Sequence, residues 1–288
     1  MTATDMNSDR PRAAAETLAP AKVNLALHLL GRRPDGFHEI DSLVTFAEFG
    51  DRVGIAPSGR LSLRVSGPFG ELIPDGGDNL VLRAAGLLHP HAGAALRLQK
   101  NIPVAAGLGG GSSDAAAALR LLSDHWQCPI PAADRLALLG ADIPVCLAAA
   151  SSHVQGIGER VSPVRNLPKL ALVLGNPGIP LATAEVYRAS GGTAQSPLPP
   201  LPRRMSAAEL ADWLKSQRND LQAAAQRICP QIGEMLAVIG QCRNCLMARL
   251  SGSGASCFGI FTDAAAARAA ASELHGKKTG WWAVATSG

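Results

Sequence analysis

The sequence is poor in aromatic and charged residues, and it contains no long hydrophobic run. Aromatic residues make up 4% and charged residues 17% of its 288 positions, and Tyr187 is the only tyrosine. No apolar stretch approaches the ~20 residues that a membrane-spanning helix requires. Hydrophobic residues nevertheless account for 47% of the chain, which is more than a disordered chain contains. We therefore expect a globular protein that has no membrane partner.

The N-terminus and the cysteines point to the same cellular compartment. Residues 1–19 lack the apolar core of a secretory signal peptide, and we interpret them as a flexible tail. Six cysteines suit reduced thiols in a cytoplasmic enzyme. Cys242 and Cys245 have the C-x-x-C spacing, but no second pair lies at the distance of a zinc site. We interpret this pair as structural or incidental, and we expect a cytoplasmic localisation.

The charge is distributed unevenly along the chain. Residues 1–163 contain 14 Lys/Arg against 16 Asp/Glu, whereas the remaining residues contain 13 against 7, within a net charge of +4. The basic residues of the second part are scattered and have few aromatic neighbours, which argues against nucleic-acid binding. An anionic small molecule is the partner that this distribution favours.

Lysine is almost absent from residues 1–163, where Lys22 and Lys100 stand against twelve arginines. A chain with this bias keeps lysine where a compact ammonium is needed. Residues 18–30 alternate and then become fully apolar, a pattern that predicts a strand. Lys22 and Asn24 are two positions apart, so their side chains share one face of that strand. A lysine at the edge of the sheet that extends its ammonium into solvent is the alternative for Lys22.

A glycine-rich segment, residues 101–118, is the most informative stretch of the chain. Its four clustered glycines are followed by two serines and by an alanine-rich stretch that predicts a helix. Glycines allow successive backbone N–H groups to converge, and a helix N-terminus adds unpaired donors and partial positive charge. The segment therefore predicts a binding site for an anion, and a polyphosphate is the anion that it favours. A glycine hinge in front of a helix is the less favoured alternative.

Two well-known phosphate-binding patterns are excluded by the residues themselves. The P-loop requires a lysine after its last glycine, and no lysine follows any glycine of this loop. The dinucleotide fingerprint G-x-G-x-x-G, counted from Gly107, would need a third glycine at the position of Ser112.

Residues 103–114, Pro-Val-Ala-Ala-Gly-Leu-Gly-Gly-Gly-Ser-Ser-Asp, resemble the phosphate loop of the GHMP kinases, the superfamily of galactokinase and of homoserine, mevalonate and phosphomevalonate kinases. Residues 20–24 resemble the first motif of that family. Residues 250–258 resemble its third motif, which packs against the phosphate loop. The resemblance implies an α+β fold of two domains with the active site in the cleft between them. We expect a tail over 1–19, an ATP-binding domain over 20–163 and a C-terminal domain over 164–288.

The resemblance also implies how ATP binds. In the family the glycine loop holds the phosphates, and an asparagine and a lysine elsewhere approach the adenosine. Transferred to this chain, the phosphate-binding residues are Pro103, Gly107, Leu108, Gly109, Gly110, Gly111, Ser112 and Ser113, and the adenosine-binding residues are Asn79 and Lys100. Mg²⁺ is expected to accompany ATP, with Ser112 or Ser113 as a candidate contact and no acidic ligand identified.

The expected catalytic pair is Asp142 and Lys22. Residues 140–145, Gly-Ala-Asp-Ile-Pro-Val, resemble the family segment that carries the catalytic aspartate, and the lysine of the first motif belongs to the same site. From the residues alone, Asp142 could be a simple turn former, because Gly140 ends the preceding helix. Pro144 is expected to keep Ile143 out of helical geometry.

The Pro-Asp-Gly of residues 34–36 predicts a turn, and Phe37 and His38 follow it. On their own these two residues could be a core aromatic and a surface histidine. One branch of the family, which phosphorylates an alcohol carrying a cytidine diphosphate group, has an aromatic–histidine pair here that holds the cytosine. The resemblance implies a substrate site formed by Asn24, Phe37, His38, Asp142, Thr183 and Tyr187. The alternatives are another GHMP kinase, acting on mevalonate, homoserine or a sugar, and a silent binding protein. We expect a monomer or a homodimer.

The remaining secondary structure is predicted from periodicity and from helix caps. We expect strands at 39–48, 55–66, 94–99, 169–175 and 281–285. Helices are expected at 78–88, 132–139, 207–216, 220–239 with a break at Pro230, and 263–275. A further helix begins at Thr183, which we predict to be its cap, and an exposed loop covers 191–202.

Overall fold

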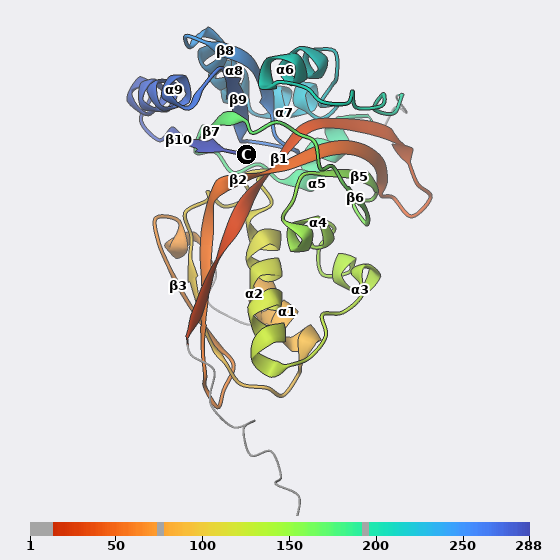
Figure 1. Cartoon of the computed structure of the whole chain (residues 1–288), viewed down its shortest axis with the longest axis vertical. Coiled ribbons are helices and arrows are strands. Elements are labelled where there is room, and N and C mark those ends of the chain that lie inside the picture. The colour runs from red at the N-terminus through yellow and green to blue at the C-terminus, as the bar shows by residue number, and fades with distance from the viewer. Residues whose placement is uncertain (1–13, 74–77, 192–195) are drawn as a thin grey trace, which may run out of the picture.

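The computed structural model describes residues 14–73, 78–191 and 196–288, and it has an α+β architecture built on two β-sheets (Figure 1). The first sheet has six strands in the order β3-β4-β2-β5-β6, with β1 paired to β2. Its strands are β1 (Ala15–Arg32), β2 (His38–Ala56), β3 (Ser62–Ser66), β4 (Ala95–Gln99), β5 (Ser152–Gly156) and β6 (Arg160–Pro163). All of its pairings are antiparallel except that of β3 with β4.

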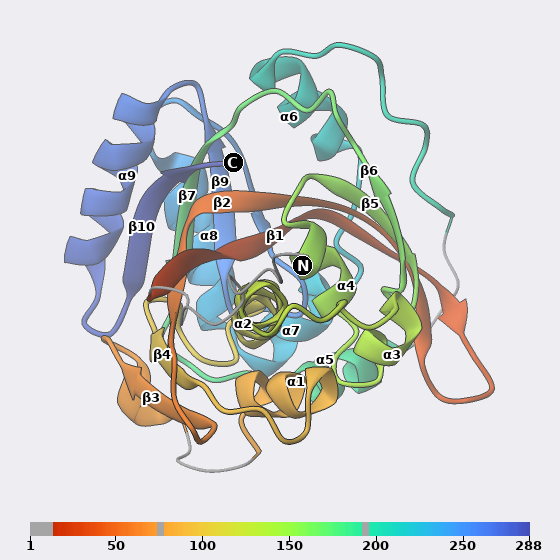
Figure 2. The same cartoon turned by 60° about the horizontal axis from the view of Figure 1, so that its bottom comes forward.

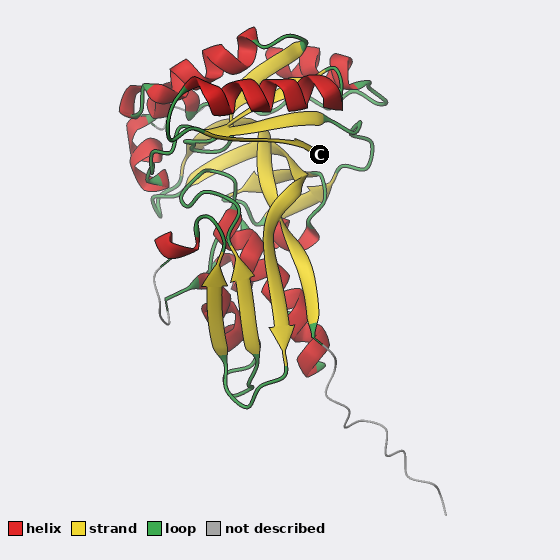
Figure 3. Cartoon of the chain, turned by 90° about the vertical axis from the view of Figure 1, so that its left-hand side faces the viewer, coloured by secondary structure: helices red, strands yellow, loops and turns green. Residues whose placement is uncertain are grey.

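The second sheet has four antiparallel strands in the order β10-β7-β9-β8. Its strands are β7 (Ala171–Asn176), β8 (Cys245–Leu250), β9 (Cys257–Phe261) and β10 (Trp282–Ser287). This sheet lies at the top of Figure 1, and helices cover its outer side (Figure 3).

The helices divide along the chain in the same way. The first half contains α1 (Leu80–Leu88), α2 (Gly110–Trp126), α3 (Ala133–Ala137) and α4 (Ile143–Ala148). The second half contains α5 (Thr183–Ala189), α6 (Ala207–Lys215), α7 (Gln222–Ile228), α8 (Gln231–Gln241) and α9 (Ala264–Lys277). Among the described residues, no helix is long and apolar enough to cross a membrane. Helix α2 is seen along its axis in Figure 2, between the hairpin of β1 and β2 and helix α1.

The long hairpin of β1 and β2 connects the two halves of the molecule. The predicted Pro-Asp-Gly turn joins its strands, and the N–H of Phe37 donates to Asp35 Oδ1 at 3.1 Å. In the middle of β1, Val23 and Leu25 are fully buried in a core that also contains Leu172 and Phe258 of the second sheet. Because β1 is covered on both of its faces, residues 19–29 are all buried, including the polar Lys22, Asn24 and His28.

Most of the predicted elements are confirmed, including the helices after Asn79 and Asp263, whose side chains accept from backbone N–H groups at the helix starts. The break at Pro230 is confirmed between α7 and α8. The expected strand over 55–66 is wrong as a single element, because β2 ends at Ala56 and β3 begins at Ser62. The expected tail over 1–19 is also too long: β1 begins at Ala15 and pairs with β2, while residues 1–13 lie outside the described residues.

The prediction that Pro144 keeps Ile143 out of helical geometry is wrong, because Ile143 begins α4. Proline is tolerated in the first turn of a helix, where its missing N–H would have no intrahelical partner. The expected loop over 191–202 is free of helix and strand wherever it is described, and residues 192–195 lie outside the description. The domain boundary at 163/164 stays a prediction, and it falls between the end of β6 and the start of β7.

Candidate active site

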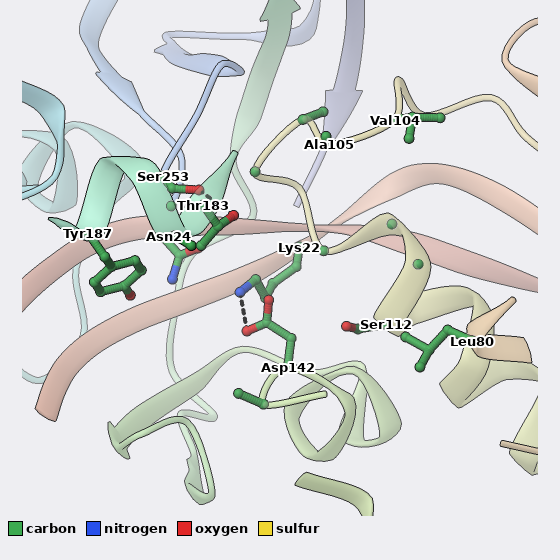
Figure 4. Close-up of a pocket in the computed structure, with 18 of the residues that line it drawn as sticks. Lys22, Asn24, Leu80, Val104, Ala105, Ser112, Asp142, Thr183, Tyr187 and Ser253 are labelled. Atoms are coloured by element: carbon green, nitrogen blue, oxygen red, sulfur yellow. Dashed lines mark hydrogen bonds and ion pairs between the residues drawn. The ribbon is translucent and has the colours of Figure 1, made fainter. Parts of the chain in front are cut away.

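A cavity of about 1070 Å³ lies between the two halves of the molecule. Its walls come from β1, the β1–β2 turn, the start of α1, the glycine loop, the segment before α4, α5 and the β8–β9 loop. Figure 4 shows Lys22 and Asp142 in its middle, with Tyr187 and Asn24 on one side and Ser112 and Leu80 on the other. Fifteen of the seventeen residues that the sequence predicts for the site line this cavity, and Leu108 and Ser113 do not.

The glycine loop places the start of α2 at the cavity. Gly107 and Gly109 have φ angles of +72° and +63°, a left-handed backbone that favours glycine. Gly109 is the residue before the helix, and no side chain caps the helix there. The first N–H groups of α2 therefore have no intrahelical acceptor and no capping side chain. With the partial positive charge of the helix end, they form a site suited to an anion.

The second glycine loop packs against the first, as the resemblance implies. The Ser251 hydroxyl donates to the Gly107 carbonyl at 3.1 Å, and the N–H of Ser256 donates to the Ala106 carbonyl at 3.0 Å. A Cβ on Gly107 would lie 2.6 Å from the carbonyl oxygens of Gly254 and Ser251. The close approach of the two loops therefore requires glycine at position 107.

Leu108 and Ser113 stabilise the structure of the loop and do not line the cavity. Leu108 is buried in the core, and its carbonyl accepts the N–H of Lys22 at 2.8 Å. Ser113 is fully buried, and its hydroxyl donates to the Pro20 carbonyl at 2.8 Å. Of the two serines expected near Mg²⁺, Ser113 is buried away from the cavity. Ser112 does line the cavity.

Lys22 and Asp142 form an ion pair with 2.5 Å between Nζ and Oδ1. Lys22 is only 6% exposed, which excludes the alternative of a solvent-extended edge lysine. The Asp142 side chain keeps 40% of its surface exposed. A Cβ on Gly109 would lie 3.2 Å from Lys22 Cβ, so the glycine loop rests directly on the lysine stem. Lys22 therefore lies between the glycine loop and the accessible carboxylate of Asp142.

Asn24, on the same face of β1 as Lys22, presents an unpaired acceptor. The Ser42 hydroxyl donates to the Ala26 carbonyl at 2.7 Å and accepts from Asn24 Nδ2 at 2.8 Å. This arrangement fixes the orientation of the amide. Within the described part of the chain, no group donates to the buried Asn24 Oδ1. A buried acceptor without a partner costs free energy, and Asn24 is one of the residues that line the cavity.

The opposite end of the cavity is aromatic. The rings of His38 and Tyr187 are tilted against each other, with their centroids 5.1 Å apart. Phe37 lines the same cavity and is 56% exposed. Burial and the neighbouring Arg32 charge lower the pKa of His38, so its ring is neutral at physiological pH. Burial and the Asp142 charge raise the pKa of Tyr187, so its phenol stays protonated.

Thr183 lines the cavity but does not cap α5 as predicted. The residue in the cap position is Ala182, and it has no side chain that could bond there. The Thr183 hydroxyl instead lies 2.9 Å from that of Ser253. This hydrogen bond ties α5 to the β8–β9 loop and leaves the hydroxyl at the cavity wall.

Asn79 and Lys100 also line the cavity. Asn79 Oδ1 accepts the N–H of Val81 at 2.9 Å and caps α1. Lys100 is 3% exposed, and its ammonium donates to Asp51 and, at 2.8 Å, to Asp114. The sequence interpretation assigned no site role to Asp51 or to Asp114, the last residue of the phosphate-loop motif. The signal that could have found them is Lys100 itself, because a lysine next to a buried loop needs carboxylate partners.

Lys100, Asp51 and Asp114 influence one another's protonation. Burial alone would lower the pKa of Lys100, but the Asp114 and Asp51 charges outweigh it, so that its pKa is raised. Burial raises the pKa of the Asp114 carboxyl to about 8, with the Lys100 ammonium opposing this shift and the Asp51 carboxylate adding to it. Lys100 therefore stays charged at physiological pH.

The donor set suits a metal ion brought by a ligand rather than one held by the protein alone. Among the described residues, no group of three or more His, Cys, Asp or Glu side chains could hold a metal ion. The Ser112 hydroxyl is a cavity-lining oxygen close to the anion site. Mg²⁺ typically keeps several waters and binds through substrate phosphates, so this set fits an ion bound to a polyphosphate.

Comparisons with known proteins agree on one family. The description "GHMP kinases N terminal domain" matches residues 79–157, and "GHMP kinases C terminal" matches residues 201–278. A Paramagnetospirillum magneticum protein is 49% identical over 92% of this chain and 95% of its own length. A protein from a strain of Cereibacter sphaeroides is 47% identical over 93% and 96%. Both relatives are named 4-diphosphocytidyl-2-C-methyl-D-erythritol kinase.

A solved structure resembles the chain over nearly its whole length. It is a crystal structure of 4-(cytidine 5'-diphospho)-2C-methyl-D-erythritol kinase, with a TM-score of 0.75 and 32% sequence identity. The match covers 95% of this chain and 98% of that one.

Proposed function

We propose a reaction for this chain from the family to which it belongs, the GHMP kinases, and within them the 4-diphosphocytidyl-2-C-methyl-D-erythritol kinases. The chain phosphorylates 4-diphosphocytidyl-2-C-methyl-D-erythritol at its 2-hydroxyl. ATP is the phosphoryl donor, and the products are the 2-phosphate and ADP, in the non-mevalonate route to isoprenoid precursors. The observation that carries the proposal is the Lys22–Asp142 pair, which lies in one cavity between an anion site and an aromatic pocket.

Asp142 is the proposed general base. Its exposed carboxylate accepts the proton of the substrate hydroxyl while the hydroxyl oxygen attacks the γ-phosphorus and ADP leaves. Lys22, paired with the same carboxylate, orients the hydroxyl and stabilises the developing negative charge on its oxygen. Because phosphoryl transfer demands little covalent chemistry from the protein, most of the rate acceleration comes from positioning and electrostatic stabilisation.

The glycine loop and the start of α2 bind the ATP phosphates through backbone N–H groups. Asn79 and Lys100 lie at the part of the cavity that we assign to adenosine, together with the apolar Leu80 and Leu98. Ser112 is the side chain that would contact a Mg²⁺ ion bound to the ATP phosphates, and such an ion would neutralise part of the phosphate charge. The remaining loop residues of the phosphate site are Pro103, Gly107, Gly109, Gly110 and Gly111.

The aromatic end of the cavity receives the cytosine. Phe37 and Tyr187 offer ring faces for stacking, and the neutral His38 imidazole supplies a donor and an acceptor for the edge of the base. Asn24 and Thr183 are placed to hydrogen-bond the polar part of the substrate. A small-molecule substrate at this site fits a cytoplasmic enzyme without a nucleic-acid partner, and we propose that it acts as a monomer or homodimer.

Substrate specificity is tested by measuring ADP release with the cytidyl substrate, mevalonate, homoserine and galactose in parallel. Turnover of the cytidyl substrate alone supports the assignment. Faster turnover of a free alcohol would assign the chain to another activity of the family, and no turnover with any of them would leave a binding protein.

Replacing Tyr187 tests the proposed cytosine pocket. Stacking of a base on an aromatic ring contributes ~1–3 kcal/mol, so Tyr187→Ala should raise KM for the cytidyl substrate roughly fivefold or more. The KM for ATP should stay within about twofold. Tyr187→Phe keeps the ring and should be mild. A Tyr187→Ala enzyme with an unchanged KM for the cytidyl substrate would refute this assignment.

A further inference from the structure

A buried cluster of three ionisable side chains lies beneath the glycine loop, outside the groups that touch the reacting atoms. Asp51 is 0%, Asp114 2% and Lys100 3% exposed. Buried ion clusters contribute little to stability compared with well-packed apolar residues of similar volume. Stability alone is therefore a poor account of three buried ionisable groups at this position.

The cluster anchors the first two residues of the glycine-rich segment. Asp51, on β2, accepts the successive backbone N–H groups of Asn101 and Ile102 at Oδ1, at 2.5 and 2.9 Å. The Asn101 side chain donates in turn to the Gly50 carbonyl at 3.0 Å. The first residues of the loop are thus attached to β2 by hydrogen bonds to a charged acceptor, which are stronger than those between neutral groups.

The same cluster reaches the exit of the loop. Lys100 immediately precedes the loop, and its ammonium bridges Asp51 Oδ2 to Asp114 Oδ2, which lies in the second turn of α2. A Cβ on Gly110 would lie 3.2 Å from Lys100 Nζ and 3.5 Å from Asp51 Oδ2. The ammonium is therefore packed against the first residue of α2, where the N–H groups of the anion site begin.

We propose that Asp51 and Asp114 are positioning residues for ATP: acting through Lys100, they hold both ends of the glycine loop at the spacing at which its N–H groups converge on the phosphates. Asp51 does not line the cavity, and Asp114 lines it with a side chain that is almost fully buried. Their contribution is to ATP affinity, because the alcohol site at Asn24 and Tyr187 is built from other elements. This inference rests on the proposed kinase function only for the kinetic part of its test.

The main test is the isosteric variant Asp51→Asn. An asparagine at this position can still accept both backbone N–H groups, but its Nδ2 would face the Lys100 ammonium, donor against donor. Affinity for a non-hydrolysable ATP analogue with Mg²⁺, measured by calorimetry, should fall about tenfold. KM for ATP should rise in parallel, while kcat and the KM for the cytidyl substrate stay within about twofold.

Asp114 provides a second test with its own rescue. Asp114→Ala removes the acceptor for Lys100 and should weaken analogue binding severalfold, whereas Asp114→Asn keeps an oxygen for Lys100 and should restore most of the affinity. Combined with Asp51→Asn, Asp114→Ala should add little, because both changes act through one ammonium.

Asp41→Asn is the matched control. Asp41 lies on the same strand, its side chain is 2% exposed, and it accepts the N–H of Leu198 and contacts His153 outside the cavity. The Asp41→Asn substitution should lower the free energy of unfolding without changing affinity for the ATP analogue. The proposal is overturned if folded Asp51→Asn binds the analogue normally, or if Asp41→Asn weakens binding equally. Should Asp51→Asn not fold, equal affinities of Asp114→Ala and wild type overturn it. Normal analogue binding without turnover of the cytidyl substrate would instead count against the proposed function.

Discussion

Lys22 and Asp142 differ in exposure, and the difference bears on their roles. Lys22 is almost completely buried, whereas the Asp142 side chain keeps 40% of its surface exposed. A proton acceptor must reach the substrate, and an ammonium that orients it acts best where water does not screen its charge. The sequence predicted both residues by resemblance, and the structure adds that Asp142 is the more exposed of the two.

Replacing Asp142 by asparagine should remove the proposed base and keep its size. We expect kcat to fall by roughly 100-fold or more, because general-base catalysis contributes about 10²–10⁴-fold. KM for the cytidyl substrate should change much less. Steady-state kinetics would show this, with Asp212→Asn as a control on the exposed surface of α6. Near-normal kcat in Asp142→Asn would mean that another group accepts the proton.

Among the elements, the glycine loop shows that its glycines are not equivalent. Gly107 has a positive φ, and a Cβ there would meet backbone oxygens of the β8–β9 loop at 2.6 Å. Gly111, in the first turn of α2, has open space around the position of a Cβ. The glycines of this loop therefore differ in whether backbone conformation and close packing require the absence of a Cβ.

This contrast predicts opposite effects of the same substitution. Gly107→Ala forces a left-handed alanine, which costs ~1–2 kcal/mol, and pushes the two loops apart, so that the melting temperature should fall by several degrees. Gly111→Ala places a better helix former in α2 and should leave the melting temperature unchanged or slightly higher. Thermal unfolding without ligand would distinguish them. Equal melting temperatures for the two variants would contradict the loop-packing account.

At the scale of the whole molecule, the last strand connects the two sheets. Trp282, the first residue of β10, stacks at a tilt on Phe49 of β2, with ring centroids 5.7 Å apart, and its ring lies edge-on to Phe69 at 6.5 Å. β10 itself pairs with β7 in the second sheet. The cavity is lined from both halves, so this aromatic contact helps to keep its walls together.

Removing that ring should destabilise the whole fold. Trp282→Ala loses buried aromatic area and two ring contacts, and we expect the free energy of unfolding to fall by about 2–3 kcal/mol, less than for a fully buried tryptophan. Chemical denaturation measures this loss. Leu138→Ala is the control, because Leu138 is 86% exposed and its loss should change stability by about 0.5 kcal/mol at most. Equal losses in the two variants would show that the Trp282 contact does not join the sheets.

The sequence by itself determined the local backbone structures and the features shared with the family. The Pro-Asp-Gly turn, the capped helices after Asn79 and Asp263 and the glycine loop before α2 were all predictable, because each depends on backbone preferences and hydrogen bonds within a few residues. The family followed from three motifs in a fixed order, and the reacting pair followed from the first of them and from the separate segment at residues 140–145. Those motifs state which residue types occur together, but not which atoms are in contact.

Only the tertiary structure decided the partners of the buried polar groups. Lys100 binds a carboxylate 49 positions earlier, the His38 ring meets a tyrosine from α5, and Asn24 keeps an unpaired oxygen because Ser42 fixes its amide. The hydroxyl of Thr183 reaches Ser253 and leaves its helix uncapped. Such pairings depend on how distant elements pack, and a buried charge or amide accepts whichever partner that packing brings within hydrogen-bond distance.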